Sequence, residues 1–284
     1  MTIGDSRSAV SGLVRDFYED MPFNYYSDPQ DAADRAKGNP IEVYRDLDGL
    51  LRGGGVGNVL EIGCGAGWAA NAIALNYARP VTAVDMTQKA LDRAIDVAKR
   101  IGTDGLTRFI RSDLFDFDTR DRFDLVLSIG VLHHTFDCRQ ALHHISAFVA
   151  EGKYIFLGLY HRPGREPFLD LLRGIVATEG EEAAFRRYAQ LHPELRDATH
   201  LRSWFRDQVL HPHETQHTLA EVLGWMDAEG FTLISTSINR YGSVDDRPAL
   251  IEAETAYGAL SHQRNHIDNQ FFPGFFTILA QRSG

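Results

Sequence analysis

The stretch Val59-Leu60-Glu61-Ile62-Gly63-Cys64-Gly65-Ala66-Gly67-Trp68 decides the fold of this 284-residue chain. An apolar strand over 59–63 ends in glycines at alternate positions, and a helical pattern over 67–77 follows at once. The glycines let the backbone turn tightly and come close to a ligand. The N-terminus of the helix offers unpaired N–H groups to a negatively charged group. The stretch therefore predicts a strand–loop–helix unit that holds a cofactor.

Two residues distinguish this stretch from a dinucleotide-binding loop. Such a loop has a third glycine or an alanine three positions after its second glycine, whereas Trp68 stands three positions after Gly65. Glu61 precedes Gly63 by two residues, where its carboxylate would repel a pyrophosphate. A cofactor with a cationic amino-acid end and no phosphate suits Glu61 better. The alternative is that the glycines serve only a tight turn from strand to helix.

Strands and helices alternate downstream of the glycine loop. We expect strands at 80–85, 106–113, 123–130, 152–160, 231–239 and 275–282, with helices at 88–100, about 137–149 and 217–229. Several of these strands are almost continuously apolar, which is typical of a sheet covered by helices on both faces. The pattern predicts an α/β protein with a doubly wound, seven-stranded, mostly parallel sheet.

Three segments lie outside this alternation. The core is expected over 56–160, 217–239 and 275–284, and the additional segments are 1–55, 161–216 and 240–274. The first of them has a helical pattern at 7–19 and another at 40–51, separated by an aromatic stretch that prolines break. Ligands of open α/β sheets bind beyond the carboxyl ends of the strands. We therefore expect the three segments to form a helical cap over or beside that edge.

Acidic residues end the two strands that follow the loop. Asp85 ends the second strand, where an acid can accept hydrogen bonds from both hydroxyls of a ribose. It could instead begin the next helix, although Thr87 is better placed as the N-cap. Asp113 ends the third strand and can accept a hydrogen bond from an adenine amino group, with Leu114 giving an amide or apolar contact. The alternative for Asp113 is a solvated turn.

The motifs E-I-G-C-G-A-G, V-D-M, S-D-L and F-D-L-V-L-S-I-G-V-L-H-H occur in a familiar order and spacing. Over about 59–160 the chain resembles the class I S-adenosylmethionine-dependent methyltransferases. The resemblance implies S-adenosyl-L-methionine as the methyl donor and S-adenosyl-L-homocysteine as the product. It implies cofactor-binding roles for Glu61, Gly63, Cys64, Gly65 and Gly67 at the methionine end, Asp85 and Met86 at the ribose, Asp113 and Leu114 at the adenine, and Ser128 and Gly130 at the methionine part.

A pair of histidines follows the fourth strand, on the substrate side of such a site. His133 or His134 could take a proton from an acceptor oxygen or nitrogen, because the pKa of imidazole lies near neutrality. We expect His133 to face the cofactor, since it is closer to the end of the strand. The alternative is that both histidines only pack or orient the loop.

Candidate acceptor-binding residues lie in the additional segments and after the fifth strand. They are Tyr18, Tyr25, Tyr26, Tyr160, Arg162, Arg165 and His213. A guanidinium after the fifth strand could bind a carboxylate or phosphate of the substrate, or pair with surface acids. His213 and His217 have the spacing of metal ligands on a helix, but no cysteine or second acidic pair completes a set. We therefore predict no metal site and place His213 in a loop that lines the substrate pocket.

Composition restricts the partners and the location of the protein. The formal net charge of −10 argues against a broad nucleic-acid surface. Two cysteines, Cys64 and Cys138, cannot form a disulfide framework, which favours a reducing compartment. The chain shows neither a signal-peptide pattern nor an apolar run of about 20 residues. We expect a cytoplasmic, soluble protein without nucleic-acid or membrane partners; composition gives no oligomeric state.

The predicted activity is methyl transfer to a small-molecule acceptor. A carboxylate-bearing acceptor is favoured by Arg162 and Arg165. The acceptor atom stays open, because one fold hosts many chemistries. The alternatives are an RNA or protein methyltransferase with the same cofactor, and a non-catalytic subunit that binds it.

Overall fold

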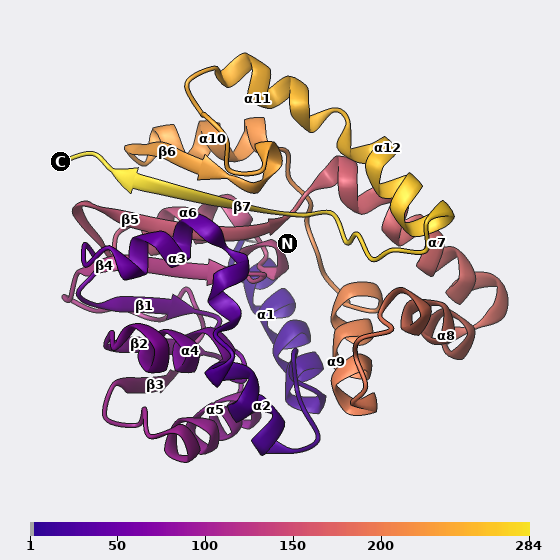
Figure 1. The fold of residues 1–284 in the computed structure, drawn as a ribbon, viewed down its shortest axis with the longest axis horizontal. Helices are drawn as coiled ribbons and strands as arrows, with labels where there is room; N and C mark the ends of the chain where they lie inside the picture. Colours follow the sequence, from indigo (N-terminus) through magenta and orange to yellow (C-terminus); the bar gives the residue numbers. More distant parts are fainter. Residues whose placement is uncertain (1–2) are drawn as a thin grey trace.

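A seven-stranded sheet forms the centre of the computed structural model, which describes residues 3–284 (Figure 1). Its strands are β1 (Val59–Ile62), β2 (Val81–Asp85), β3 (Thr107–Arg111), β4 (Phe123–Ile129), β5 (Val149–Tyr160), β6 (Phe231–Thr236) and β7 (Phe275–Arg282). The strand order is β3-β2-β1-β4-β5-β7-β6, and among the described strands β7 alone runs opposite in direction to the other six. The predicted doubly wound, mostly parallel sheet is confirmed.

The central strand β1 brings the predicted site residues to one edge. Glu61 pairs with Ala83 of β2 on one side and with Leu127 of β4 on the other. Because these strands are parallel, their carboxyl ends meet at the same edge of the sheet. The segments that follow β1, β2, β3 and β4 therefore leave the sheet side by side.

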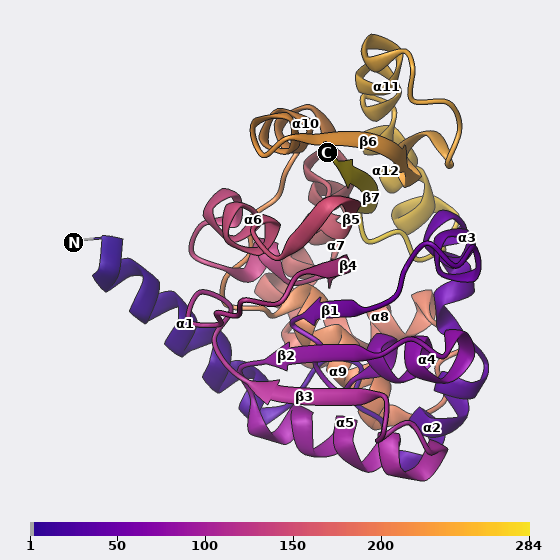
Figure 2. The same ribbon diagram turned by 90° about the vertical axis from the view of Figure 1, so that its left-hand side faces the viewer.

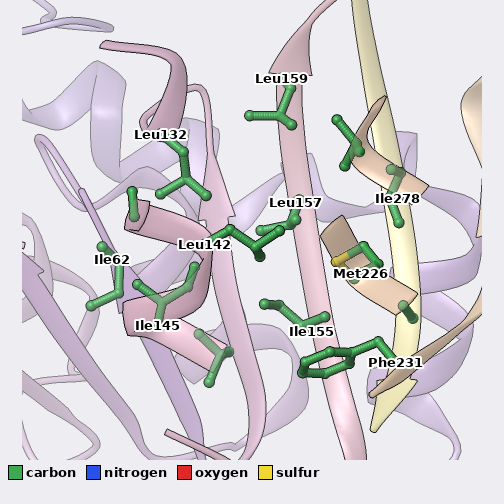
Figure 3. Packing of buried hydrophobic residues seen from close by; sticks show 14 of the residues in the cluster. Ile62, Leu132, Leu142, Ile145, Ile155, Leu157, Leu159, Met226, Phe231 and Ile278 are labelled. Atoms are coloured by element: carbon green, nitrogen blue, oxygen red, sulfur yellow. The ribbon is translucent and has the colours of Figure 1, made fainter. Parts of the chain in front are cut away.

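Helices cover both faces of the sheet. The core helices are α4 (Trp68–Tyr77), α5 (Gln88–Ile101), α6 (Cys138–Ser146) and α10 (Leu219–Ala228). Successive side chains of a strand point to opposite faces, so Leu60 and Ile62 join one apolar cluster and Val59 joins the other. The first cluster includes Ile145 of α6 and Met226 of α10 beside β5 (Figure 3). The second packs against the alanine-rich face of α4.

The additional segments are mainly helical, as expected. They contain α1 (Ile3–Asp20), α2 (Pro29–Lys37), α3 (Arg45–Arg52), α7 (Arg162–Glu179), α8 (Glu181–Leu191), α9 (Ala198–Val209), α11 (Arg247–Glu254) and α12 (Tyr257–His262). Short turns of 3₁₀-helix cover Pro40–Val43, Leu132–His134 and Ser237–Asn239, and a π-turn covers Gln263–Ile267. No helix among residues 3–284 is both long and apolar enough to span a bilayer.

Two local predictions are corrected. The helix expected at 40–51 is divided, because Tyr44 has a non-helical backbone between the 3₁₀ turn and α3. Between the aromatic stretch and this helix lies α2, for which the sequence pattern predicted no element. Pro29 stands in the first turn of α2, where its missing N–H costs nothing, and the Asp28 side chain accepts a hydrogen bond from the Gln30 N–H at 2.8 Å.

Two of the three additional segments cover the carboxyl edge of the sheet. Helix α1 crosses the ends of β2 and β3 (Figure 2), and α9 lies beside α1 (Figure 1). Helices α7, α8 and α9 have an apolar cluster of their own, built around Phe168, Tyr188 and Phe205. The third segment differs from the expected cap, since α11 packs on α10 and α12 packs on α7.

Candidate functional site

The carboxyl ends of β1 to β4 open onto a cavity of about 980 Å³, part of it open to solvent. Residues of the sheet edge form one wall: Ile62–Ala66, Trp68, Val84–Thr87, Ala90, Ser112–Phe115 and Ile129–Val131. The opposite wall consists of Ser11, Val14, Tyr18, Pro22, Phe23, His134, Thr135 and Asp207. The mainly apolar lining with a few polar groups is typical of a small-molecule pocket. None of the lining residues comes from segment 240–274.

The glycine loop has the backbone that its sequence requires. Gly63, Gly65 and Gly67 have φ values of +74°, +51° and +76°, a region that favours glycine. A Cβ on Gly63 would lie 2.3 Å from a methyl of Val131, and one on Gly67 would lie 2.6 Å from the Cβ of Ala94. Gly63, Cys64 and Gly65 line the cavity, whereas Gly67 lets α4 pack against α5.

Glu61 lies beneath this loop and does not line the cavity. Its side chain is buried on the α4 side of the sheet, where it accepts a hydrogen bond from the backbone N–H of Ala70. Burial raises the pKa of Glu61 to about 8, and its Oε2 has no hydrogen-bond partner in the described part of the chain. A free buried carboxyl oxygen directly behind the loop fits a ligand that brings positive charge.

Asp85 lines the cavity and also holds the loop. Its Oδ2 accepts from the Gly65 N–H at 2.8 Å, while its Oδ1 accepts from the Thr87 N–H at 2.9 Å and the Thr87 hydroxyl at 2.7 Å. Thr87, and not Asp85, is the N-cap of α5, so Asp85 shapes the turn before that helix. A carboxylate offers about four lone-pair positions, so one remains for a ribose hydroxyl rather than two. Burial raises the pKa of Asp85.

The remaining cofactor candidates separate into two groups. Met86, Asp113, Leu114 and Gly130 line the cavity. Asp113 accepts a hydrogen bond from the Phe115 N–H at 2.9 Å, which shapes the turn after β3. Ser128 lies elsewhere: it is fully buried, and its hydroxyl donates to the carbonyl oxygen of Ile62 at 3.3 Å.

The two histidines face in different directions. His133 does not line the cavity, contrary to expectation, because the 3₁₀ turn directs its ring toward β5. There its Nδ1 accepts from the Tyr160 N–H at 3.2 Å, and its ring stacks on that of Tyr160 at 3.9 Å. His134 lines the cavity instead, and its Nδ1 donates to the carbonyl oxygen of His213 at 2.9 Å.

This hydrogen bond fixes the tautomer of His134. A carbonyl oxygen only accepts, so Nδ1 carries the proton and Nε2 carries a lone pair. Nε2 has no hydrogen-bond partner in the described part of the chain. Burial lowers the pKa of His134 to about 4, so the ring is neutral at pH 7. His134 thus lies in a wall of the cavity and has an unprotonated nitrogen that is itself buried.

Opposite the glycine loop, a carboxyl group that the sequence analysis missed joins two helices. Asp207 of α9 lines the cavity and is 6% exposed. Its Oδ1 accepts from the hydroxyl of Tyr18 at 2.6 Å, and its Oδ2 accepts from the hydroxyl of Tyr160 at 3.3 Å. Tyr18 lines the cavity as predicted, whereas Tyr160 lies behind Asp207. No local signal in the sequence distinguishes Asp207, because α9 mixes apolar, polar and charged residues as many surface helices do.

Comparison with known proteins finds matches to the same part of the chain. A family model described as a methyltransferase domain matches residues 59–152. Over these residues the chain is similar to a methyltransferase domain. This match agrees with the predicted methyl donor, S-adenosylmethionine. An uncharacterized protein of Synechococcus sp. is 24% identical over 200 residues, which are 63% of this chain and 48% of that protein. The chain therefore spans about half the length of the curated relative it matches.

Solved structures share the fold of the methyltransferase domain at low sequence identity. PKMT2 from Rickettsia typhi in complex with AdoHcy is 14% identical, with a TM-score of 0.56, over 81% of this chain and 49% of that one. Magnesium protoporphyrin IX methyltransferase from Synechocystis PCC 6803 with bound SAM is 14% identical, with a TM-score of 0.51, over 96% and 97%. The YcgJ protein from Bacillus subtilis is 18% identical, with a TM-score of 0.51, over 85% and 99%.

Two of the tyrosines expected at the substrate lie outside the cavity of the methyltransferase domain. The Tyr25 hydroxyl accepts from Arg93 at 2.9 Å, and Tyr26 stacks on His200 at 3.9 Å. Both residues anchor the segment after α1 to neighbouring helices. From the same aromatic stretch, Phe23 reaches the cavity instead.

The two arginines are also occupied elsewhere, and neither lines the cavity. Arg162 donates to Glu221 at 3.0 Å, near the surface. Arg165 is fully buried and donates to Glu214 at 2.9 Å and to the carbonyl oxygen of Gln208 at 2.6 Å. The expectation of a carboxylate-bearing acceptor rested on these two residues, so it loses its basis.

His213 supports the site without lining it. Its Nε2 donates to the carbonyl oxygen of Thr135 at 3.0 Å, and its own carbonyl oxygen orients His134. Residues 3–284 contain no group of three or more His, Cys, Asp or Glu side chains placed to hold a metal ion.

Proposed function

We propose that this protein transfers the methyl group of S-adenosylmethionine to a small-molecule acceptor. One observation carries the proposal: a single cavity extends from the glycine loop to Tyr18, His134 and Asp207, and α1 and α9 wall it. A small acceptor fits between the loop and these helices. A macromolecular acceptor would need an open approach at the edge that α1 crosses (Figure 2).

The cofactor would occupy the wall formed by the sheet edge. Gly63 and Gly65 would hold its methionine part, Asp85 its ribose, and Asp113 with Leu114 its adenine. When bound, it supplies a methyl group that a cationic sulfur already activates. The protein then has to align the acceptor with that methyl group and to exclude water.

His134 would accept the proton of the acceptor. The cofactor would supply the methyl group to the acceptor atom, and the Nε2 of His134 would take the hydrogen of that atom as a proton. The hydrogen bond from Nδ1 to His213 holds the ring in the tautomer that this step needs. Positioned bases of this kind contribute typically 10²–10⁴-fold to a rate.

The first test measures cofactor binding. Titration calorimetry with S-adenosylhomocysteine should give a binding isotherm, and Asp85→Ala should weaken it by about 10-fold or more, equivalent to about 1.4 kcal/mol. Asp92→Ala is the matched control, because Asp92 lies on α5 and bonds to Gln88 outside the cavity. Equal affinity of all three proteins for S-adenosylhomocysteine would contradict the assignment of the sheet-edge wall to the cofactor.

The second test identifies the class of acceptor. The protein is incubated with S-adenosylmethionine labelled in its methyl group and with a bacterial extract that ultrafiltration has divided by size. We expect label in the small-molecule fraction. Label confined to the macromolecular fraction would favour an RNA or protein acceptor, and label in neither fraction would contradict an enzymatic role.

A further inference from the structure

The charged side chains that line the cavity, among the described residues, are all acidic. None of the described residues that line the cavity is Lys or Arg, whereas Asp85, Asp113 and Asp207 all line it. Asp85 and Asp113 belong to the wall assigned to the cofactor, where both bond to backbone N–H groups. Asp207 stands apart on α9, in the opposite wall, and no backbone N–H binds it in the described part of the chain.

Two tyrosines hold Asp207 in place and leave part of it free. Tyr18 donates to Oδ1 and Tyr160 donates to Oδ2, so each oxygen has one partner. A carboxylate has about four lone-pair positions, so about two remain. The ring of Tyr160 lies 3.6 Å from the guanidinium carbon of Arg165, which fixes the hydroxyl that orients the carboxylate.

Other polar groups of this wall also accept hydrogen bonds. The Tyr18 oxygen can still accept because its hydrogen is given to Asp207, and the Nε2 of His134, which is buried behind this wall, carries a lone pair and no hydrogen. The Thr135 hydroxyl donates to the carbonyl oxygen of Leu132 at 2.6 Å, so it offers no hydrogen to a ligand. A molecule that fits this wall must therefore supply the donors.

We infer that Asp207 binds a hydrogen-bond donor of the methyl acceptor, and that the acceptor is a neutral or cationic molecule with a hydroxyl or amine group. The inference rests on the proposed function and specifies its substrate class. An anionic acceptor would lie beside a buried carboxylate without a cationic partner, which is strongly unfavourable. A hydroxyl or ammonium group would satisfy the free positions of Asp207.

The electrostatic surroundings of Asp207 agree with this role. Burial raises the pKa of Asp207 to about 6, while the hydrogen bond from Tyr18 and the charge of Arg165 lower it. The carboxyl group is therefore mostly ionised at pH 7 and above. Glu214, the nearest further acid, is paired with Arg165, so Asp207 supplies the negative charge of this wall.

Three probes of similar shape test the inference: benzylamine, benzyl alcohol and benzoate. Binding to the protein saturated with S-adenosylhomocysteine is measured at pH 7.5 by ligand-observed NMR. Benzylamine and benzyl alcohol should bind, and benzoate should bind at least about 10-fold more weakly. Benzoate binding as tightly as benzylamine would overturn the inference, and so would a failure of both donor probes to bind at millimolar concentration.

Variants locate the effect at Asp207. Asp207→Asn should weaken benzylamine by about 10-fold or more, because a charge-assisted hydrogen bond is lost. Asp197→Asn is the matched control: Asp197 caps the same helix, bonds to Ser27 and lies outside the cavity. Equal loss in both variants, or no loss in Asp207→Asn, would contradict the assignment. The probe series on the unaltered protein decides the substrate class if Asp207→Asn does not fold.

The same samples separate this inference from the proposed function. Calorimetry with S-adenosylhomocysteine reports the cofactor wall and does not depend on the probes. Loss of that binding in the unaltered protein would remove the proposed function. Retained cofactor binding without discrimination among the probes would remove only the assignment of Asp207 and of the acceptor class.

Discussion

The buried carboxyl of Glu61 couples the stability of the ligand-free protein to pH. Burial raises its pKa from the usual 4.5 to about 8, so the folded protein keeps a proton that the unfolded chain has already lost at pH 7. A group whose pKa is higher in the folded state than in the unfolded state contributes its full stabilisation at pH values below the unfolded pKa. This stabilisation is lost as the pH rises toward the folded pKa. The free energy of unfolding should therefore fall between about pH 4.5 and pH 8.

Replacing Glu61 by Gln should flatten this dependence. Gln has a similar shape but no titration, so between pH 5 and 7.5 the unaltered protein should lose about 3 kcal/mol more than the variant. Urea unfolding over that pH range, without cofactor, measures the difference. Glu151→Gln, at an exposed position of β5, should behave like the unaltered protein. Parallel pH curves for Glu61→Gln and the unaltered protein would show that Glu61 is ionised in the fold.

Replacing His134 should change the rate of methyl transfer rather than the stability of the fold. His134→Gln keeps a polar side chain but removes the basic nitrogen, so methyl incorporation into the small-molecule fraction should fall about 10²-fold or more. Affinity for S-adenosylhomocysteine should stay within about twofold, since each tenfold corresponds to about 1.4 kcal/mol. His133→Gln serves for comparison, because His133 packs on Tyr160 outside the cavity. A greater loss of turnover in His133→Gln, at equal stability, would reverse the assignment.

Among the elements, the loop between β1 and α4 depends on particular glycines for different reasons. Gly63 needs both its positive φ and the space beside Val131, whereas Gly65 needs only its φ, with no atom within 4 Å of an added Cβ. A left-handed backbone costs a residue with a Cβ roughly 1–2 kcal/mol. Overpacking adds typically 1–3 kcal/mol.

Gly63→Ala should therefore cost more stability than Gly65→Ala, by about 1–3 kcal/mol. Denaturant unfolding of the two variants without cofactor measures this difference. Both variants should bind S-adenosylhomocysteine more weakly, because the loop lines the cavity. A larger loss of stability in Gly65→Ala would mean that the Val131 side chain moves aside at little cost, and that the backbone angle φ determines the effect of both replacements.

Elements built from local patterns could be predicted, whereas contacts between distant segments could not. The strands and the loop at 59–68 follow from apolar runs, glycine spacing and acids at strand ends, all of which are readable within a few residues. Asp207 meets Tyr18 across 189 positions of sequence. Nothing near Asp207 in the sequence indicates that α9 will lie beside α1. The orientation of the His133 ring was also not predicted, because a single 3₁₀ turn sets the direction of the ring.

Across the whole molecule, Arg165 contacts four segments. It lies against Tyr160 at the end of β5, and it donates to the carbonyl oxygen of Gln208 in α9, to Glu214 after α9 and to the carbonyl oxygen of Pro273 before β7. The arginine expected to bind substrate thus connects the sheet to the helices that wall the cavity. Replacing Arg165 should therefore lower the stability of the entire fold.

Arg165→Met should lower the free energy of unfolding by about 3–5 kcal/mol, because the buried carboxylate of Glu214 loses its buried cationic partner and keeps only Arg173, at 3.7 Å, as an ion-pair partner. Arg162→Met is the natural control: Arg162 pairs with Glu221 near the surface, so its loss should cost less than about 1 kcal/mol. Urea unfolding at pH 7.5 compares the two. Glu214→Gln introduced together with Arg165→Met removes the buried negative charge and should restore part of the loss. If the double variant is no more stable than Arg165→Met alone, the cost lies in the lost packing and carbonyl contacts of the guanidinium, and the pair with Glu214 contributes little to holding the four segments together.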